Sequence, residues 1–353
     1  CFWFFFATVF GQRGLGLMRW ETTVLSSLTL TVMLQFMPDM GEAFYWFNGG
    51  VGNVFIYSLM ALSAALLVRL YRTESRGGAA GLTAVLLLCM AALGGGSYSG
   101  GLFSLCALAC VLAWLFGKRR PRRWRFLLCF AVLAAGFVYS MTAPGNTVRA
   151  GMIGYTCSPV KAVARSLYEG VILMAGYARF PLLGLTALVS PLLWRAAKDS
   201  PYTFRHPFWL IFLTAGLFCA QLTPPIYSIA SIGDGRIQDT YWLCFVALWL
   251  LWVYLLLGFA ARKWPDAKPE RLSRALVIGG LCLSLAGGLG CRYPGDTLYG
   301  LQNMTGNSAW LSLASGEAAQ YDREMTERER LLNDDTQPVV TLEPLTAVPR
   351  IFM

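Results

Sequence analysis

Long runs of apolar residues constrain this chain more than any other feature. A helix needs about 20 predominantly apolar residues to cross a bilayer. Nine stretches approach or exceed that length, near residues 21–37, 52–70, 79–96, 99–116, 126–143, 167–194, 208–223, 240–261 and 275–290. Residues 1–10 are similar to the end of another span. The pattern predicts an all-α integral membrane protein with nine to ten transmembrane helices.

The composition excludes an ordinary soluble domain and a nucleic-acid-binding protein. The 353 residues are 56% hydrophobic and 14% charged, whereas soluble domains carry about 25% charged residues. The net charge is +10. Nucleic-acid binding requires the basic residues on one face together with a recognition motif, and the sequence contains no such motif. The best basic cluster, KRRPRRWR at 118–125, is also typical of a cytoplasmic loop between membrane spans.

The distribution of basic residues between connections predicts the orientation. Of the 29 lysines and arginines, 19 lie in alternate connections. The other connections contain only Arg149, Lys161, Arg165 and Arg236. Because basic loops are retained in the cytoplasm, the second set of loops is expected on the outer face. Residues 1–290 then form the transmembrane domain, and the more acidic residues 291–353 form an extracytoplasmic segment with a helix near 317–332. We expect the chain to begin partway through a helix and its C-terminal segment to be incomplete.

The segment at 38–53, PDMGEAFYWFNGGVGN, is the first candidate site on the outer face. Asp39 and Glu42 could act as a general base or hold a divalent cation. Tyr45 and Trp46 could stack on a sugar ring beside Asn48. The alternative is an interfacial aromatic belt with solvated carboxylates, which leaves the nearby glycines unexplained.

Two further outer segments carry charge in tight turns. Asn146 and Arg149 follow the Pro-Gly turn of APGNTVRAG at 143–151, and arginine suits bidentate binding of phosphate. Asp234 and Arg236 lie in the Gly-Asp-Gly-Arg turn, close to Asp239. The alternatives are an arginine that reaches lipid headgroups and a surface cluster whose charges pair with one another.

The stretch at 167–194 contains two charges within or beside a predicted span. Glu169 and Arg179 are ten residues apart, about 15 Å along a straight helix, so they cannot pair there. Pro181 could break the segment into two helices. His206 is the single histidine and falls in a predicted cytoplasmic loop, which excludes a Ser-His-Asp triad on the outer face.

Several short motifs together resemble a known group of proteins. They are Glu42 before Tyr45-Trp46 and Asn-Gly-Gly, the turn Ala143-Pro-Gly-Asn-x-x-Arg149, the Gly235-Arg236 loop and Pro-Val-Val at 338–340. The chain resembles an uncharacterised bacterial polytopic membrane family that is distantly similar to the GT-C glycosyltransferases. The resemblance implies a protein of the bacterial cytoplasmic membrane that transfers a sugar from a polyprenyl-phosphate donor on the outer face. GT-C enzymes typically carry a catalytic acid on their first outer loop. We expect that loop to precede Cys1, so Glu42 or Asp39 is the substitute for that residue within this chain.

Three functions remain open on the sequence. A glycosyltransferase for envelope glycans would use Glu42 or Asp39 as base and Arg149 and Arg236 to stabilise the departing lipid phosphate. A transporter or lipid flippase would instead show interrupted helices and charges near the bilayer midplane. A noncatalytic component of envelope polysaccharide assembly is the third. The expected partners are membrane lipids and a polyprenyl-phosphate-linked sugar, with no cofactor implied beyond a divalent cation at the carboxylates.

Overall fold

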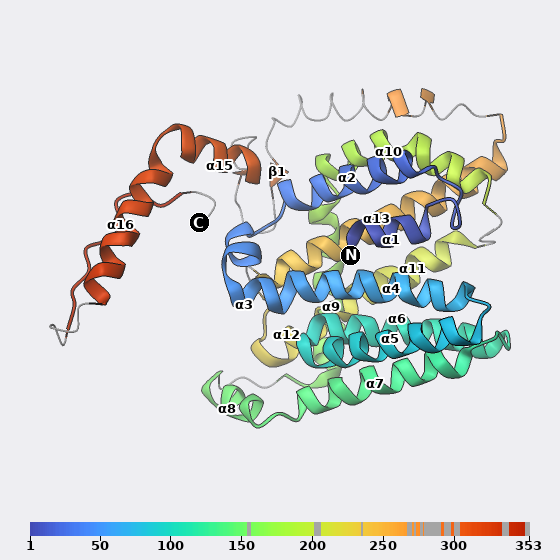
Figure 1. The fold of residues 1–353 in the computed structure, drawn as a ribbon, viewed down its shortest axis with the longest axis horizontal. Coiled ribbons are helices and arrows are strands. Elements are labelled where there is room, and N and C mark those ends of the chain that lie inside the picture. The colour runs from blue at the N-terminus through green and yellow to red at the C-terminus, as the bar shows by residue number, and fades with distance from the viewer. Residues whose placement is uncertain are drawn as a thin grey trace.

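A computed structural model describes most of the chain (Figure 1). The described residues are 1–153, 157–200, 206–233, 236–266, 270–271, 273–275, 278, 291–292, 298–299, 304–333 and 339–349. Helices dominate these residues, and the β-structure among them consists of a two-residue antiparallel pair.

The helices follow one another with short connections. Residues 1–72 contain α1 (Phe2–Val9), α2 (Arg19–Gln35), the π-helical turn η1 (Gly41–Tyr45), α3 (Phe47–Gly49), the π-helical turn η2 (Gly50–Phe55) and α4 (Ile56–Arg72). The next group is α5 (Arg76–Gly96), α6 (Tyr98–Gly117), α7 (Arg123–Met141), α8 (Pro144–Ile153), α9 (Pro159–Tyr177) and α10 (Phe180–Lys198). Then come α11 (Pro207–Ala220), α12 (Thr223–Ile229), α13 (Arg236–Lys263), β1 (Cys291–Arg292), β2 (Leu298–Tyr299), α15 (Thr305–Ala314) and α16 (Glu317–Leu332).

Within the described residues, six helical segments are long and apolar enough to cross a membrane. They are Phe47–Arg72, Arg76–Gly96, Tyr98–Gly117, Arg123–Met141, Pro207–Ile229 and Ile237–Lys263. A seventh span results if Pro159–Tyr177 and Pro181–Lys198, which meet at a bend of 71°, are one broken span. The chain is therefore a multi-pass helical membrane protein, but the predicted nine to ten spans are not confirmed.

Each predicted span that does not appear among the candidate membrane-spanning helices is absent for its own reason. The run at 21–37 forms α2, whose 17 residues RWETTVLSSLTLTVMLQ are rich in Thr and Ser and include Glu21. Residues 1–10 form only the eight-residue α1. The run at 167–194 is broken after Tyr177, where Arg179 has an extended backbone and Pro181 opens the next helix. The predicted span at 275–290 lies outside the described residues, apart from 275 and 278.

Serine side chains cap three of the helices at their N-termini. Ser75 accepts a hydrogen bond from the Gly78 amide, Ser97 from Gly100 and Ser158 from Lys161. Each bond satisfies one of the amides that a helix start leaves without a partner. The glycines near 94–101 thus mark a tight connection between α5 and α6.

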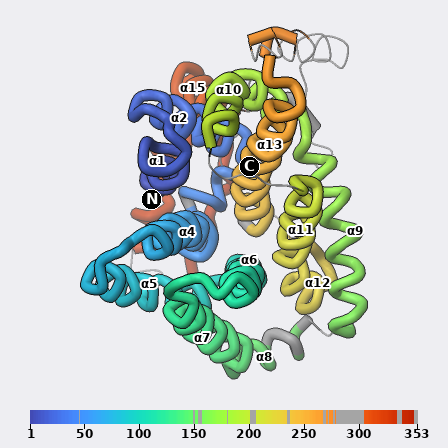
Figure 2. Tube along the Cα trace, turned by 90° about the vertical axis from the view of Figure 1, so that its right-hand side faces the viewer, coloured from blue at the N-terminus to red at the C-terminus, as the bar shows by residue number. Residues whose placement is uncertain are grey.

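The buried apolar residues form two cores. One lies within α4, α5, α6 and α7, and the other joins α1 and α2 to α9 through α13. Figure 2 shows α4 to α7 gathered together, with α1, α2, α10 and α13 grouped on one side of them. Within the α4–α7 core, a Cβ on Gly94 would lie 2.6 Å from the Leu133 carbonyl oxygen. This glycine therefore lets α5 and α7 approach closely, as small residues do between membrane helices.

The two ends of the helical body differ in chemistry. The arginine-rich connections α4–α5 and α6–α7 lie at one end, while α3, α8 and α12 lie at the other (Figure 1). Residues 305–332 form α15 and α16, so the helix predicted near 317–332 is confirmed. The Thr305 hydroxyl donates to the Leu34 carbonyl and the Gly306 amide to the Gln35 side chain, at the end of α2. These bonds attach α15 and α16 to the helical body at the end opposite the arginine-rich connections.

Candidate functional site

The segment predicted as a site, 38–53, has an irregular backbone. It forms two π-helical turns, η1 and η2, separated by α3 and by Trp46 in an extended conformation. π-Helical turns are rare and are frequent at functional sites. Phe44, Trp46 and Phe47 are exposed, Phe47 to 79%. This segment therefore presents an aromatic surface at the end of the helical body.

Asp239, in the first turn of α13, connects this segment to the core. It is fully buried, and its Oδ1 accepts a hydrogen bond of 2.8 Å from the Asp39 amide. The Asp39 Oδ1 in turn accepts a bond of 2.9 Å from the Glu42 amide. The second carboxylate oxygen of Asp239 is buried without a hydrogen-bond partner in the described part of the chain. Asp39, Glu42 and Asp239 thus gather at one place.

A second contact attaches η2 to α13. The Thr240 hydroxyl donates to Asn53 Oδ1 at 3.3 Å, and the Asn53 Nδ2 donates to the Gly49 carbonyl at 3.1 Å. A Cβ on Gly49 would lie only 2.0 Å from the Glu42 carbonyl oxygen. This glycine therefore allows a close backbone approach within the segment, whereas Gly52 has open space around it.

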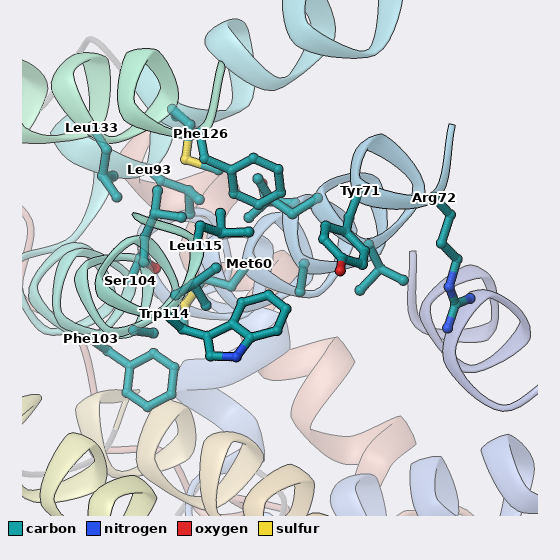
Figure 3. A pocket seen from close by; sticks show the side chains of 18 residues that line it. Met60, Tyr71, Arg72, Leu93, Phe103, Ser104, Trp114, Leu115, Phe126 and Leu133 are labelled. Carbon is teal, nitrogen blue, oxygen red and sulfur yellow. The ribbon is translucent and has the colours of Figure 1, made fainter. Parts of the chain in front are cut away.

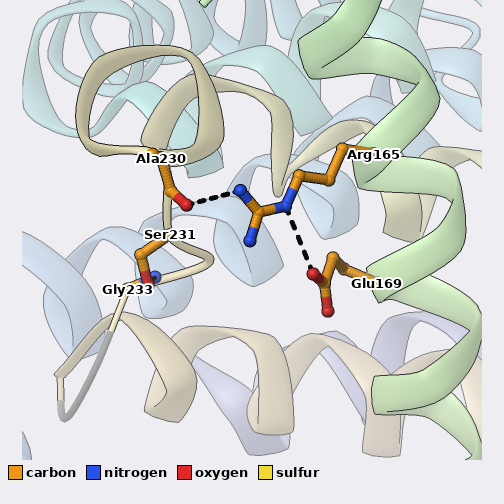
Figure 4. Close-up of polar contacts among 5 residues, drawn as sticks. All are labelled: Arg165, Glu169, Ala230, Ser231 and Gly233. Atoms are coloured by element: carbon orange, nitrogen blue, oxygen red, sulfur yellow. Dashed lines mark hydrogen bonds and ion pairs between the residues drawn. The ribbon is translucent and has the colours of Figure 1, made fainter. Parts of the chain in front are cut away.

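An ion pair in α9 lies beside the loop that follows α12 (Figure 4). Arg165 Nε is 3.3 Å from Glu169 Oε1 one turn along α9. Its Nη1 donates to the Ala230 carbonyl at 2.7 Å. Ala230 has φ of +57°, an uncommon conformation for a residue with a side chain. Both charges lie in the helix that forms half of the broken span, where ionisable groups usually have a functional role.

The loop at 230–233 joins this ion pair to α13. The Tyr241 hydroxyl donates to the Ile232 carbonyl at 3.0 Å, and the Gln238 side chain donates to the Gly233 carbonyl at 3.1 Å. The Tyr177 hydroxyl donates to the Gln238 carbonyl at 3.2 Å. We call the connected set the polar layer: Asp39, Glu42, Asn53, Arg165, Glu169, the loop 230–233 and residues 238–241.

The structure brings some of the predicted site residues together. Asp39 and Glu42 meet at Asp239, and Trp46 and Asn48 are exposed on the same segment. Tyr45 belongs to η1, but its side chain lies outside the described part. Its predicted stacking on a sugar stays a prediction.

Asn146 has an evident structural role. Its Nδ2 donates to the Ser140 and Met141 carbonyls at 2.9 and 3.1 Å, and its Oδ1 accepts from the Tyr98 hydroxyl at 2.9 Å. These bonds satisfy carbonyls at the end of α7. They occupy the amide that was predicted to bind substrate.

The predicted phosphate-binding residues are placed only by their backbones. Arg149 lies in α8, which is set apart from α3 at the same end of the molecule (Figure 1). Arg236 begins α13, three residues before Asp239. The side chains of both arginines, and all of Asp234, lie outside the described residues.

Sequence reasoning left Asp239 and Arg165 out of the site. Asp239 was noted beside Asp234 and Arg236 in a candidate outer segment, with a surface cluster as the alternative, but it was not assigned to the site. An acidic residue at the start of a long apolar run was the available signal for its burial. Arg165 was counted only as a basic residue of an outer connection, and the Glu169 four residues later was the available signal. No group of three His, Cys, Asp or Glu side chains in the described part of the chain has the geometry to hold a metal ion.

Fold and site together define a multi-pass helical membrane protein with the polar layer, around the buried Asp239, at one end. No family model matches the chain, and comparison with the curated proteins and with the solved structures found no match.

Proposed function

We propose that the polar layer is the site of a glycosyltransferase that moves a sugar from a polyprenyl-phosphate donor to an acceptor hydroxyl in envelope glycan assembly. Asp239 carries this proposal, because one of its carboxylate oxygens is buried without a partner beside Asp39 and Glu42. A buried polar atom without a partner is costly, and such costs are often tolerated where a site binds a ligand. We place the protein in the bacterial cytoplasmic membrane with this end outside.

The reaction needs one base and one stabilised leaving group. A carboxylate, Glu42 or Asp39, takes the proton of the acceptor hydroxyl as its oxygen attacks the anomeric carbon. The bond from that carbon to the donor phosphate breaks, and polyprenyl phosphate leaves with the electron pair. Asp239 fixes the position of Asp39 through the Asp39 amide, so it is a positioning residue for the base.

Arginines at the same end supply positive charge for the departing phosphate. Arg236 starts the helix that carries Asp239, and a helix N-terminus itself favours anions. Arg149 and Asp234 are assigned to the same substrate, and Asn146 holds α8 against the end of α7. Trp46, Tyr45 and Asn48 provide the aromatic and amide surface for the sugar ring.

The test is transfer of labelled sugar from a polyprenyl phosphate by purified protein in nanodiscs. Glu42→Gln and Asp39→Asn should each lower the rate at least about 100-fold if that residue is the base. Glu74→Gln, in the α4–α5 connection at the opposite end, is the matched control and should keep the full rate. Transfer with none of the donors tried, or full activity in both carboxylate variants, would refute the proposal.

A lipid flippase is the second candidate, and two features favour it. The apolar residues form two separate cores, and α9 and α10 form an interrupted helix pair with the Arg165–Glu169 ion pair in its first half. Interrupted helices and packed halves that move are typical of transporters. Movement of a fluorescent polyprenyl phosphate between leaflets without any glycosylated product would support this function over transfer.

A further inference from the structure

A cavity of about 440 Å³ lies inside the α4–α7 core, and none of its lining residues belongs to the polar layer (Figure 3). Cavities of this size are in the range that binds small molecules. Its lining is almost entirely apolar and includes Met60, Leu67, Phe103, Ala107 and Leu133. Such a wall suits a hydrocarbon chain and offers a polar solute few partners.

The length and position of the cavity match one membrane leaflet. Its lining on α4 runs from Arg72, the last residue of that helix, to Met60. These positions are twelve residues apart, which is about 18 Å along a helix, and half of a bilayer's hydrocarbon core is about 15 Å. Figure 3 shows Tyr71 and Arg72 at one end of the cavity and Leu93 and Leu133 at the other.

Arginines surround the end of the cavity at Tyr71. The Arg120 guanidinium lies 5.5 Å from the ring centre of Trp114, which lines the cavity. Arg122 Nη1 donates to the Tyr71 carbonyl at 3.2 Å. Arg72 donates to the Thr8 carbonyl, so it ties the cavity end to α1.

The loop that holds these arginines has an unusual backbone. Arg119 and Arg122 have φ of +48° and +62°, although residues with side chains rarely adopt positive φ. The amides of Arg119 and Arg120 bond to the Phe116 and Leu115 carbonyls, which fixes the loop to the end of α6. Backbone outliers of this kind persist where the surroundings hold them and often mark sites of function.

The charge of this region is complementary to an anion. Residues 56–141 contain nine arginines and lysines, all near the Tyr71 end, and a single acidic residue, Glu74. Basic clusters at the ends of membrane helices bind anionic lipid headgroups, at about 1 kcal/mol for each basic residue. Exposed Val111 and Trp114 form part of the cavity wall, so an acyl chain can enter from the side of the bundle.

We infer that this cavity binds one acyl chain of an anionic phospholipid, whose phosphate lies against Arg120 and Arg122. The inference does not rest on the proposed glycosyltransferase function, because the cavity shares no residue with the polar layer. The positive-inside pattern places this lipid in the cytoplasmic leaflet. It is a bound structural or regulatory lipid and not the donor of the outer site.

Lipid retention on purified protein tests the inference. Native mass spectrometry after titration with dioleoyl phosphatidylglycerol should show one tightly held lipid, and dioleoyl phosphatidylcholine should bind at least about tenfold more weakly. The double variant R120Q/R122Q should weaken phosphatidylglycerol binding at least about tenfold. The matched control K118Q/R119Q, which removes the same charge from the same loop, should change it less than about threefold. An equal loss in the control would show general attraction to the basic loop and would overturn the site.

Two further measurements separate chain binding from charge alone. Ala107→Phe fills the cavity and should lower phosphatidylglycerol retention while the thermal midpoint stays within a few degrees. A phosphatidylglycerol with a diazirine in mid-chain, used on the unmodified protein, should crosslink to lining residues of α4 and α6. Crosslinks confined to outward-facing residues, or competition by glycerol phosphate as strong as by the lipid, would refute the cavity as a chain site.

Discussion

Replacement of Asp239 separates the structural and the chemical roles of its two oxygens. In Asp239→Asn, the remaining carbonyl oxygen still accepts the Asp39 amide bond, so we expect a stability change within about 1 kcal/mol. Asp239→Ala leaves the Asp39 amide without its acceptor, at a cost of about 1–3 kcal/mol. The alanine variant should therefore be less stable by about 1–3 kcal/mol.

The assay is reversible unfolding in mixed micelles followed by circular dichroism. Glu74→Ala removes an exposed carboxylate at the far end and controls for loss of charge; it should stay within about 0.5 kcal/mol of the parent. The asparagine variant should remain close to the parent in stability but lose transfer activity, because the NH2 group that replaces the unpartnered second oxygen cannot accept a hydrogen bond from the substrate. An alanine variant as stable as the parent, or an asparagine variant as unstable as the alanine one, would refute this account of Asp239.

Three other perturbations test separate parts of the structure. Gly94→Leu should destabilise the α5–α7 contact by about 1–3 kcal/mol through overpacking, and a thermal midpoint unchanged in nanodiscs would contradict the close approach. Arg165→Ala removes the partner of half-buried Glu169 and should lower the thermal midpoint. Arg165→Lys should not restore the midpoint, because lysine lacks the planar guanidinium that bonds to two acceptors at once. Full stability in the alanine variant would count against the ion pair. Hydrogen bonds from Thr346 hold the pKa of Glu324 below its ordinary value of 4.5. The contact between residues 339–349 and α16 should therefore persist at neutral pH. It should be lost as the pH falls through that lowered pKa. The protection of the 339–349 amides from hydrogen exchange, corrected for the intrinsic pH dependence of exchange, should then fall as the pH is lowered from 4.5. Protection that stays constant over this range would contradict the contact.

The fold was predictable where apolar length alone decides the structure. Six predicted stretches coincide with helices that can span a membrane, because about 20 apolar residues without charge have few other stable environments. Apolar length failed where composition was mixed. The run at 21–37 was counted for its apolar residues, but α2 is 17 residues long and also contains Thr, Ser and Glu21. The run at 167–194 was counted as one span, and the structure instead shows the break that Pro181 offered as the alternative.

The site was predictable only in part, for a physical reason. The sequence showed that Asp39 and Glu42 lie in an irregular segment with glycines, and the structure provides the irregular turns. That Asp239 accepts the Asp39 amide depends on packing between segments 200 residues apart, which no local pattern encodes. Asn146 shows the reverse case, since a turn residue with a full set of local hydrogen bonds has the same sequence signal as a ligand-binding one.

Sidedness of transfer tests the central claim most directly. The protein is reconstituted into sealed vesicles, and labelling of a cysteine placed in the 118–125 loop reports the orientation of each population. Labelled polyprenyl-phosphate sugar is then supplied with a soluble acceptor on one face only. The account predicts product only when the acceptor faces the polar layer, and a fall of at least about 100-fold with Glu42→Gln or Asp39→Asn. Product formed equally from the arginine-rich face, or no product on either face, would contradict it.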